Sequence, residues 1–265
     1  MTVEILVCIK RVPDTSENEI ELNRAGNDIE REDFVYAVNE WDNYALEEAI
    51  RIVEKNGGSV TVATVGGEDD EEVLRRALAM GANRSVLISD AAFAGSDGAG
   101  IARLLQAFVE KNHFDLILTG AQAEDGAAQV GGMLAALLDY PFAALVDSVE
   151  LLDGTKLKVS REIEGGNKEL NEIDLPCVLS IETGINEPRY VGMRSIRLVT
   201  SVEIPTLGAA ELGIDPASTG KAAAKVHRTD YFMPAASKGA EILNGGRKEV
   251  IDRLIELVRA KGGLK

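Results

Sequence analysis

The stretch Gly-Ala-Gln-Ala-Glu-Asp-Gly-Ala-Ala-Gln-Val-Gly-Gly, residues 120–132, follows the short apolar run Leu116–Leu118. Directly after it, apolar residues recur at helical spacing, at Val130, Met133, Leu134 and Leu137. This pattern predicts a strand, a glycine-rich loop and a helix in succession. Small residues in such a loop let backbone N–H groups approach a ligand phosphate closely, but they equally suit a tight connection without a ligand. The stretch therefore predicts an α/β unit and marks a candidate binding loop.

The residues before this loop repeat the alternation of strand and helix. Strands are expected at Val3–Ile9, Ser59–Val65 and Ser85–Ser89. Helices are expected from Asn39, as the capping residue, to Gly57, from Val73 to Gly81, and over Gly98–Asn112. Short strands alternating with helices are typical of a parallel sheet covered by helices. The predicted fold class is therefore α/β, with a Rossmann-like, mostly parallel sheet and helices on both faces.

The pattern changes after residue 140. Four further strands, joined in part by Asp-Gly and Gly-Gly turns, predict added β-hairpin strands at Ala144–Leu152, Lys156–Ile163, Lys168–Ile173 and Cys177–Ile181. From residue 186 to 246 the chain is rich in small residues and is expected to form an irregular extended arm that lies on a partner. Residues 247–265 contain an amphipathic helix. We therefore divide the chain into a nucleotide-binding domain (1–185), a partner-recognition loop with the arm (186–246) and a terminal helix (247–265).

Composition narrows the classes of function. The formal net charge of −16 would repel nucleic acid and anionic lipid. No apolar run reaches the roughly 18–20 residues that span a bilayer, and the first residues lack the basic lead-in of a leader. The two cysteines, Cys8 and Cys177, lie in apolar strands far apart in the sequence, as expected for core residues of a reduced protein. We therefore expect a cytoplasmic protein without nucleic-acid binding or membrane insertion.

Four segments follow strands or begin helices at the edge where ligands of parallel sheets bind. They are Cys8–Arg11, Asn39–Asp42, Val65–Gly67 and Gly120–Gly132. Within them, Trp41 suits either helix packing or a wall beside a planar cofactor, and Asp125 suits either a ribose contact or a helix cap. The sequence contains no P-loop, no GxGxxG in the first βα turn, and no GxSxG or HExxH motif. These absences disfavour common NTPases, dehydrogenases and hydrolases, and we predict no metal site and no catalytic residue.

Taken together, these segments resemble the β subunit of electron transfer flavoproteins. The matching stretches occur in the family's order and cover roughly residues 3–205. They are Val7–Asp14, Asn39–Asp42 with Ala45–Ala49, Ala77–Ala82, Gly120–Gly126 with Gln129–Gly131, Val159–Gly166 and Asn186–Tyr190.

The resemblance implies a heterodimer that carries electrons and is not a catalyst by itself. The larger α subunit would hold an FAD, and this chain would hold AMP or, in electron-bifurcating members, a second FAD. Flavin-dependent dehydrogenases would donate electrons, an acceptor such as a quinone oxidoreductase would take them, and Met193 would anchor the docking loop. The implied cofactor contacts are Cys8, Asn39, Glu40, Trp41, Asp42, Val65, Gly120, Ala121, Gln122, Ala123, Asp125, Gly126, Ala127, Ala128, Gln129 and Val130.

The chain also departs from the family pattern. Many relatives carry a basic residue in place of Ala121, a loop that is one residue longer, and a proline in place of Glu40. AMP and a second FAD therefore both remain open as the bound nucleotide, as does a bifurcating role. An alternative from another class is a stand-alone adenine-nucleotide-binding regulatory protein, and a third is an interaction scaffold with a vestigial nucleotide site. The exposed apolar arm and helix disfavour a stand-alone monomer.

Overall fold

The computed structural model describes residues 2–123, 127–235, 239–240 and 242–263. The chain divides into two compact units. The first comprises Met1–Ile20 and Glu30–Thr229, and the second comprises Glu21–Ile29 and Asp230–Lys265.

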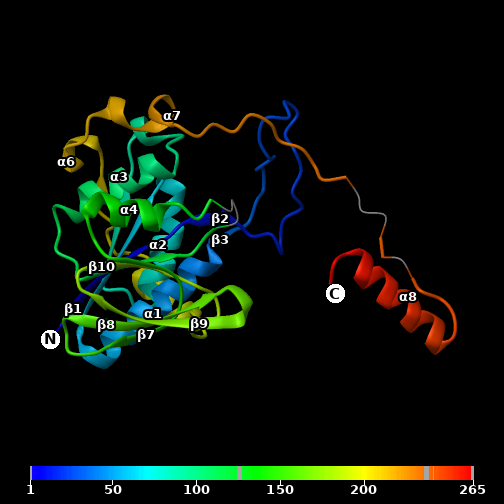
Figure 1. Ribbon diagram of the computed structural model, residues 1–265. Coiled ribbons are helices and arrows are strands. Elements are labelled where there is room, and N and C mark those ends of the chain that lie inside the picture. Colours follow the sequence, from blue (N-terminus) through cyan, green and yellow to red (C-terminus); the bar gives the residue numbers. More distant parts are fainter. Residues whose placement is uncertain (1, 124–126, 236–238, 241, 264–265) are drawn as a thin grey trace. The chain divides into compact units, whose positions relative to one another are not determined.

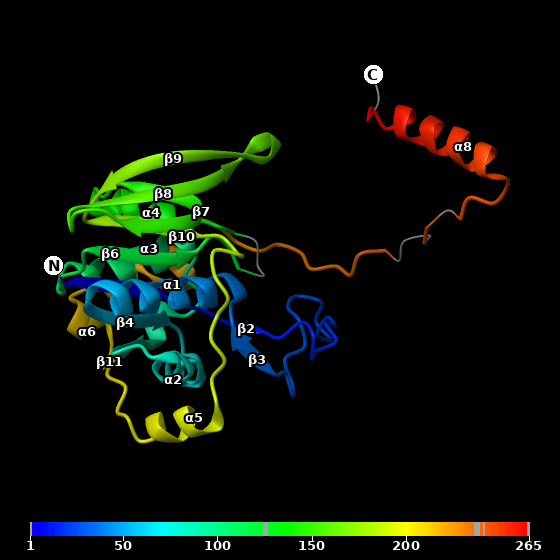
Figure 2. The same ribbon diagram turned by 90° about the horizontal axis from the view of Figure 1, so that it is seen from below.

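The first unit is built on a large sheet (Figure 1). Among the described residues, nine strands form this sheet in the order β11-β5-β4-β1-β6-β10-β7-β8-β9. The strands are β1 (Val3–Cys8), β4 (Gly58–Val65), β5 (Arg84–Ile88), β6 (Leu116–Gly120), β7 (Phe142–Leu151), β8 (Lys156–Ile163), β9 (Asn167–Asp174), β10 (Cys177–Ile181) and β11 (Thr206–Leu207). All pairs from β11 to β7 are parallel, while β7, β8 and β9 pair antiparallel and form one edge (Figure 2). Separately, β2 (Arg11–Pro13) pairs antiparallel with β3 (Tyr36–Val38).

Helices cover both faces of the parallel strands. The described α-helices are α1 (Glu40–Asn56), α2 (Glu71–Met80), α3 (Gly98–Val109), α4 (Val130–Leu138), α5 (Met193–Val199), α6 (Ala209–Leu212) and α7 (Gly220–Ala223), with α8 (Arg247–Ala260) in the second unit. One core cluster joins α1 and α2 to the sheet, and the other joins α3 and α4. Successive residues of β1 enter opposite clusters, which explains why this strand is apolar along almost its whole length. The predicted α/β class, with added antiparallel strands, is confirmed. The expectation that Cys177–Ile181 is a β-hairpin strand is wrong, because β10 lies between β6 and β7 and pairs parallel with both.

The stretch 186–246, expected to be irregular, contains more regular structure than its sequence indicated. It includes α5, α6 and α7, and β11 extends the sheet by pairing with β5. Ile204, Ala209 and Leu212 are buried there. These elements span two to seven residues each, which is too short for a hydrophobic period to reveal them in the sequence.

The second unit contains α8, whose apolar residues recur at helical spacing with none buried. Ile251 and Leu254 are about half exposed, and Phe232 and Ile242 before the helix are each 79% exposed. Among the described residues, no helix is long and apolar enough to cross a membrane.

Candidate functional site at the carboxyl ends of the strands

The predicted binding segments meet at one edge of the sheet. Cys8 ends β1 and pairs in register with Ala63 on one side and Thr119 on the other, so the ends of β4, β1 and β6 are adjacent. From β1 the chain proceeds to β4 and β5 on one side, and then crosses to β6 and β10 on the other. The direction of winding therefore reverses between β1 and β6. In open α/β sheets such a reversal opens a crevice in which ligands bind.

Asp42, in the first turn of α1, links the two strands at this reversal. Its Oδ2 accepts the backbone N–H of Lys10 at 2.8 Å, and its Oδ1 accepts that of Gly120 at 2.9 Å. The residue is only 6% exposed. Asp42 was predicted to be among the cofactor contacts, and in the structure both of its side-chain oxygens bind the protein's own backbone. Asp42 therefore shapes the edge by fixing where the strands β1 and β6 end.

Burial raises the pKa of Asp42 from 3.8 to about 7, although hydrogen bonds from Asn39, Gly120 and Lys10 oppose the shift. Because the pKa is raised on folding, the folded chain binds this proton more tightly than the unfolded chain. Below about pH 4 this proton binding contributes its full share to the free energy of unfolding. The contribution, on the order of 4 kcal/mol, is lost as the pH rises to 7.

We expect Asp42→Asn to remove this part of the pH dependence. Urea unfolding at pH 5, 6, 7 and 8 measures the difference in free energy of unfolding between wild type and variant, which should shift in favour of the variant as the pH rises. Asp90→Asn is the control, because backbone N–H groups of Ala92 and Ala209 lower the pKa of Asp90, so its difference from wild type should not change between pH 5 and pH 8. A pH-independent difference for Asp42→Asn would contradict the raised pKa.

Asn39 occupies the N-cap position of α1, as predicted, but its side chain does not cap the helix. Instead, Nδ2 donates to the backbone carbonyl of Gln122 at 2.9 Å and so holds the loop after β6. The residue is 1% exposed, and its Oδ1 has no hydrogen-bond partner among the described residues. A buried hydrogen-bond acceptor without a partner lowers the stability of the fold, so Asn39 Oδ1 is a candidate contact for a donor group of a ligand.

The two neighbours of Asn39 in this motif have different surroundings. Glu40 is exposed. The indole Nε1 of Trp41 donates to Glu182 Oε1 at 3.1 Å, and that oxygen also accepts the backbone N–H of Thr183. Trp41 therefore connects α1 to the segment after β10, which fits the packing interpretation offered for it.

Both cysteines are buried core residues. Cys8 is 9% exposed, and burial, followed by the nearby charge of Asp42, raises the pKa of its thiol. Burial also raises the pKa of Cys177 to about 12. Thiolates are therefore scarce at neutral pH, and neither side chain is suited to act as a nucleophile.

The glycine-rich loop is described only in part. Its first residues, Ala121–Ala123, follow β6, and Ala121 donates its N–H to Ile181 at 2.9 Å. The predicted contacts Asp125 and Gly126 lie outside the described residues. Further on, Ala127 is exposed, Ala128 adopts a positive φ of 47°, Gln129 is the N-cap residue of α4, and Val130 begins that helix.

A cavity of about 510 Å³ opens beside this edge, at the ends of β4 and β5. Val65 is the predicted cofactor residue that lines it, together with Gly66, Gly67 and the segment Ser89–Ser96 except Ala92. The segment 89–96 was not proposed as part of the site. It follows a predicted strand, so the rule that selected the other segments would have selected it as well. Phe93 of this segment is buried, which shows that the cavity wall is part of the core.

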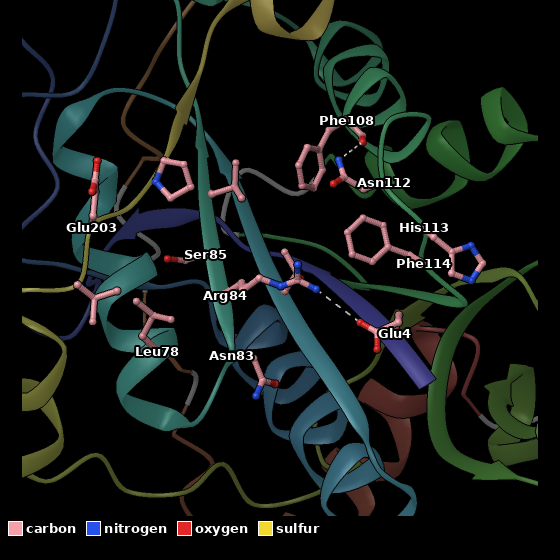
Figure 3. Close-up of a pocket in the computed structure, with 14 residues that line it drawn as sticks. Glu4, Leu78, Asn83, Arg84, Ser85, Phe108, Asn112, His113, Phe114 and Glu203 are labelled. Carbon is pink, nitrogen blue, oxygen red and sulfur yellow. Dashed lines mark hydrogen bonds and ion pairs between the residues drawn. The ribbon is translucent and has the colours of Figure 1, made fainter. Parts of the chain in front are cut away.

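A second cavity, of about 480 Å³, lies at the opposite, amino-terminal edge (Figure 3). Arg84 and Glu4 form an ion pair there, at 3.6 Å. Phe108 and Phe114 line one side, but they are only 3% and 5% exposed. None of the predicted contacts that the structure describes lines this cavity.

The segment Asn186–Tyr190 binds along α1 and leads to α5. Arg189 donates from Nε to Glu47 Oε2 at 2.9 Å and from Nη1 to Glu54 Oε1 at 2.8 Å. Asn186 donates to the carbonyl of Tyr44 at 3.1 Å and to Glu48 Oε2 at 3.0 Å. These bonds fix the residues immediately before Met193, the first residue of α5, which is 64% exposed.

No cluster of three or more potential metal ligands occurs in the parts of the chain that the structure describes. The fold and the position of the predicted segments thus define a Rossmann-like α/β protein with a candidate ligand edge at β4, β1 and β6.

Comparison with known proteins identifies the family. The family model described as the electron transfer flavoprotein domain matches residues 28–212. The chain is 38% identical over 261 residues to an electron transfer flavoprotein subunit beta of Thermoanaerobacterium thermosaccharolyticum, covering 98% of this chain and 99% of that protein. It is 32% identical over 260 residues to the subunit beta of Methylophilus methylotrophus, covering 97% and 98%. It is also 35% identical over 263 residues to the caffeyl-CoA reductase-Etf complex subunit CarD of Acetobacterium woodii, covering 98% and 99%.

The chain therefore belongs to the electron transfer flavoprotein family, among its β subunits, and its function is electron transfer.

Proposed function

We propose that this chain pairs with an electron transfer flavoprotein α subunit and binds an adenine nucleotide at the carboxyl ends of β4, β1 and β6. The observation that carries the nucleotide site is the buried Asn39 Oδ1, which has no hydrogen-bond partner among the described residues. An N–H or O–H group of a ligand would satisfy it. The cavity at the ends of β4 and β5, which Val65 lines and Asn39 does not, has a volume of about 510 Å³, within the roughly 300–1,000 Å³ range of small-molecule sites. These features fit an adenine nucleotide.

The predicted contacts have distinct roles in this proposal. Asn39 and Val65 would touch the nucleotide, while Asp42 and Trp41 hold the surrounding backbone in place. The small residues of the loop 120–130 would bring backbone N–H groups to a phosphate. Bound AMP would have a structural role, whereas a second FAD would supply a redox centre. The FAD that exchanges electrons with partners would lie mainly in the α subunit, and this chain would supply positioning and electrostatics.

The proposed partners follow from the same family assignment. Flavin-dependent dehydrogenases would dock on the segment around Met193, and an acceptor such as a quinone oxidoreductase would receive the electrons. The exposed apolar residues of the second unit, among them Phe232, Ile242 and Leu254, support an arm that lies on the α subunit. We further propose a cytoplasmic location.

Cofactor analysis of the purified heterodimer tests this proposal. The chain is co-expressed with its α-type partner, and the FAD and AMP released by denaturation are quantified per heterodimer. We expect one FAD with one AMP, or two FAD if the chain is a bifurcating member. The similarity to a subunit of the caffeyl-CoA reductase-Etf complex keeps the second result open. A colourless monomer that binds ATP tightly would contradict the proposal and favour a stand-alone regulatory protein.

Met193→Ala should slow electron exchange with the dehydrogenase roughly tenfold, because an exposed apolar anchor at the centre of an interface typically contributes 1–2 kcal/mol or more. Stopped-flow reduction of the heterodimer by the dehydrogenase measures the rate, and flavin content should not change. Leu170→Ala on β9 is the matched control, because Leu170 is 65% exposed and Met193 is 64% exposed. Loss of flavin in Met193→Ala would show instead that the residue is needed for packing.

A further inference from the structure

Near the end of the first unit, the segment that contains α7 contacts the loop that precedes α3. Figure 1 shows α7 next to this loop. The backbone N–H of Gly220 donates to Ser96 Oγ at 2.8 Å, and that of Lys221 donates to the carbonyl of Ala94 at 3.0 Å. Gly220 has a φ of 73°, and a Cβ there would lie 2.2 Å from the carbonyl oxygen of Ala92. The close approach therefore requires glycine at this position.

Asp97 continues this contact toward the end of the unit. Its Oδ1 accepts the N–H of Gly100 at 2.9 Å and so caps α3. Its Oδ2 accepts the N–H of Lys225 at 2.8 Å and that of Val226 at 3.2 Å. One carboxylate thus binds the first turn of its own helix and a residue 128 positions further along the chain. These bonds, the N–H of Gly100 first, hold the pKa of Asp97 below its usual value, so the side chain is ionised at neutral pH.

The hydrogen bonds from Lys225 and Val226 to Asp97 Oδ2 matter because of where these two residues lie in the chain. Lys225 and Val226 are exposed, and Thr229 is the last residue of the first unit. Since neither residue is buried, the charge-assisted hydrogen bonds to Asp97 keep this segment in place. A helix cap needs one acceptor oxygen, which serine also provides. The second oxygen of Asp97 has no role in capping.

We propose that Asp97 is a positioning residue that fixes the root of the C-terminal arm and thereby favours assembly with the α subunit. The inference rests on the proposed pairing with that subunit. If the root is held, the arm has fewer conformations to lose when it binds its partner. If the root is released, the population competent to bind falls, and the apparent affinity falls by the same factor.

Asp97→Ser separates the two roles of the side chain, because serine keeps the cap and lacks the second oxygen. Subunit exchange between preformed heterodimer and labelled full-length chain measures the strength of assembly, and hydrogen exchange measures the order of residues 219–226. We expect roughly tenfold faster subunit exchange and faster hydrogen exchange over 219–226, with the melting temperature of the heterodimer's flavin-bound form changed by no more than a few degrees.

Asp215→Ser is the matched control, because Asp215 also caps a short helix, through the N–H of Ala217 at 3.0 Å, in the same part of the chain. It should leave both exchange rates as in wild type. Wild-type subunit-exchange rates in Asp97→Ser would overturn this proposal alone, as would equal acceleration in Asp215→Ser. A wild-type chain that forms no heterodimer would overturn the proposed function itself, whatever Asp97 does.

Discussion

Arg189→Ala is expected to lower the free energy of unfolding by about 3 kcal/mol, the lower end of the range for breaking a buried ion pair. The Glu47 side chain is 3% exposed, and both of its oxygens accept hydrogen bonds from Arg189. Without Arg189, the carboxylate of Glu47 stays buried with much less compensation. The segment that leads to α5 would also lose its attachment to α1.

Arg51→Ala is the control, because Arg51 donates to one Glu47 oxygen, at 2.9 Å, whereas the Arg189 side chain donates to both. Partly exposed pairs on a helix contribute less than about 1 kcal/mol. Urea unfolding of both variants measures the comparison, and Glu47→Leu combined with Arg189→Met should recover most of the lost stability. Equal losses in Arg51→Ala and Arg189→Ala would show that Glu47 does not depend on Arg189.

The ion pairs of Arg189 illustrate what the sequence could and could not predict. Residues 186–190 were singled out as a family motif, but nothing in their spacing indicates that Arg189 reaches Glu47 and Glu54, more than 130 residues earlier. The strands β1, β4, β5 and β6 were predictable because each is a short, largely apolar run, and β4, β5 and β6 each lie between two predicted helices. In contrast, β11 has two residues, and its place beside β5 depends on tertiary pairing alone.

The candidate site also combines features that the sequence predicted with features that it did not. Sequence patterns indicated which segments gather at the carboxyl edge, because parallel strands place their ends together. They did not indicate what each side chain does there. Asp42 was grouped with Asn39 as a cofactor contact, yet both Asp42 oxygens bind the backbone, whereas Asn39 keeps a buried oxygen without a partner among the described residues. Hydrogen bonds between residues 32 and 78 positions apart leave no periodic signal.

Gly120→Ala should have the largest effect at the candidate site. A Cβ at Gly120 would lie 2.4 Å from Asp42 Oδ1, 2.6 Å from Trp41 Cβ and 2.9 Å from Asp42 N. Two of these three atoms are fixed by the first turn of α1, so a small side-chain rotation cannot relieve the overlap. The helix must shift, or Asp42 must give up the N–H of Gly120. Overpacking costs about 1–3 kcal/mol, and a buried hydrogen-bonding group left without its partner costs about 1–3 kcal/mol, so we expect a total loss of about 2–6 kcal/mol.

Gly67→Ala tests whether this effect is specific to Gly120. Gly67 follows β4 at the same edge, its φ is −97°, and a Cβ there would have no heavy atom within 4 Å. A surface substitution of this kind changes stability by less than about 0.5 kcal/mol. Chemical unfolding of both variants measures stability, for which Gly67→Ala is the control, and nucleotide released per heterodimer measures binding by Gly120→Ala and wild type. Gly120→Ala should reduce both stability and nucleotide binding, because the ends of β1 and β6 that Asp42 holds would move apart. If Gly120→Ala were as stable as Gly67→Ala, Asp42 would not fix this edge of the sheet.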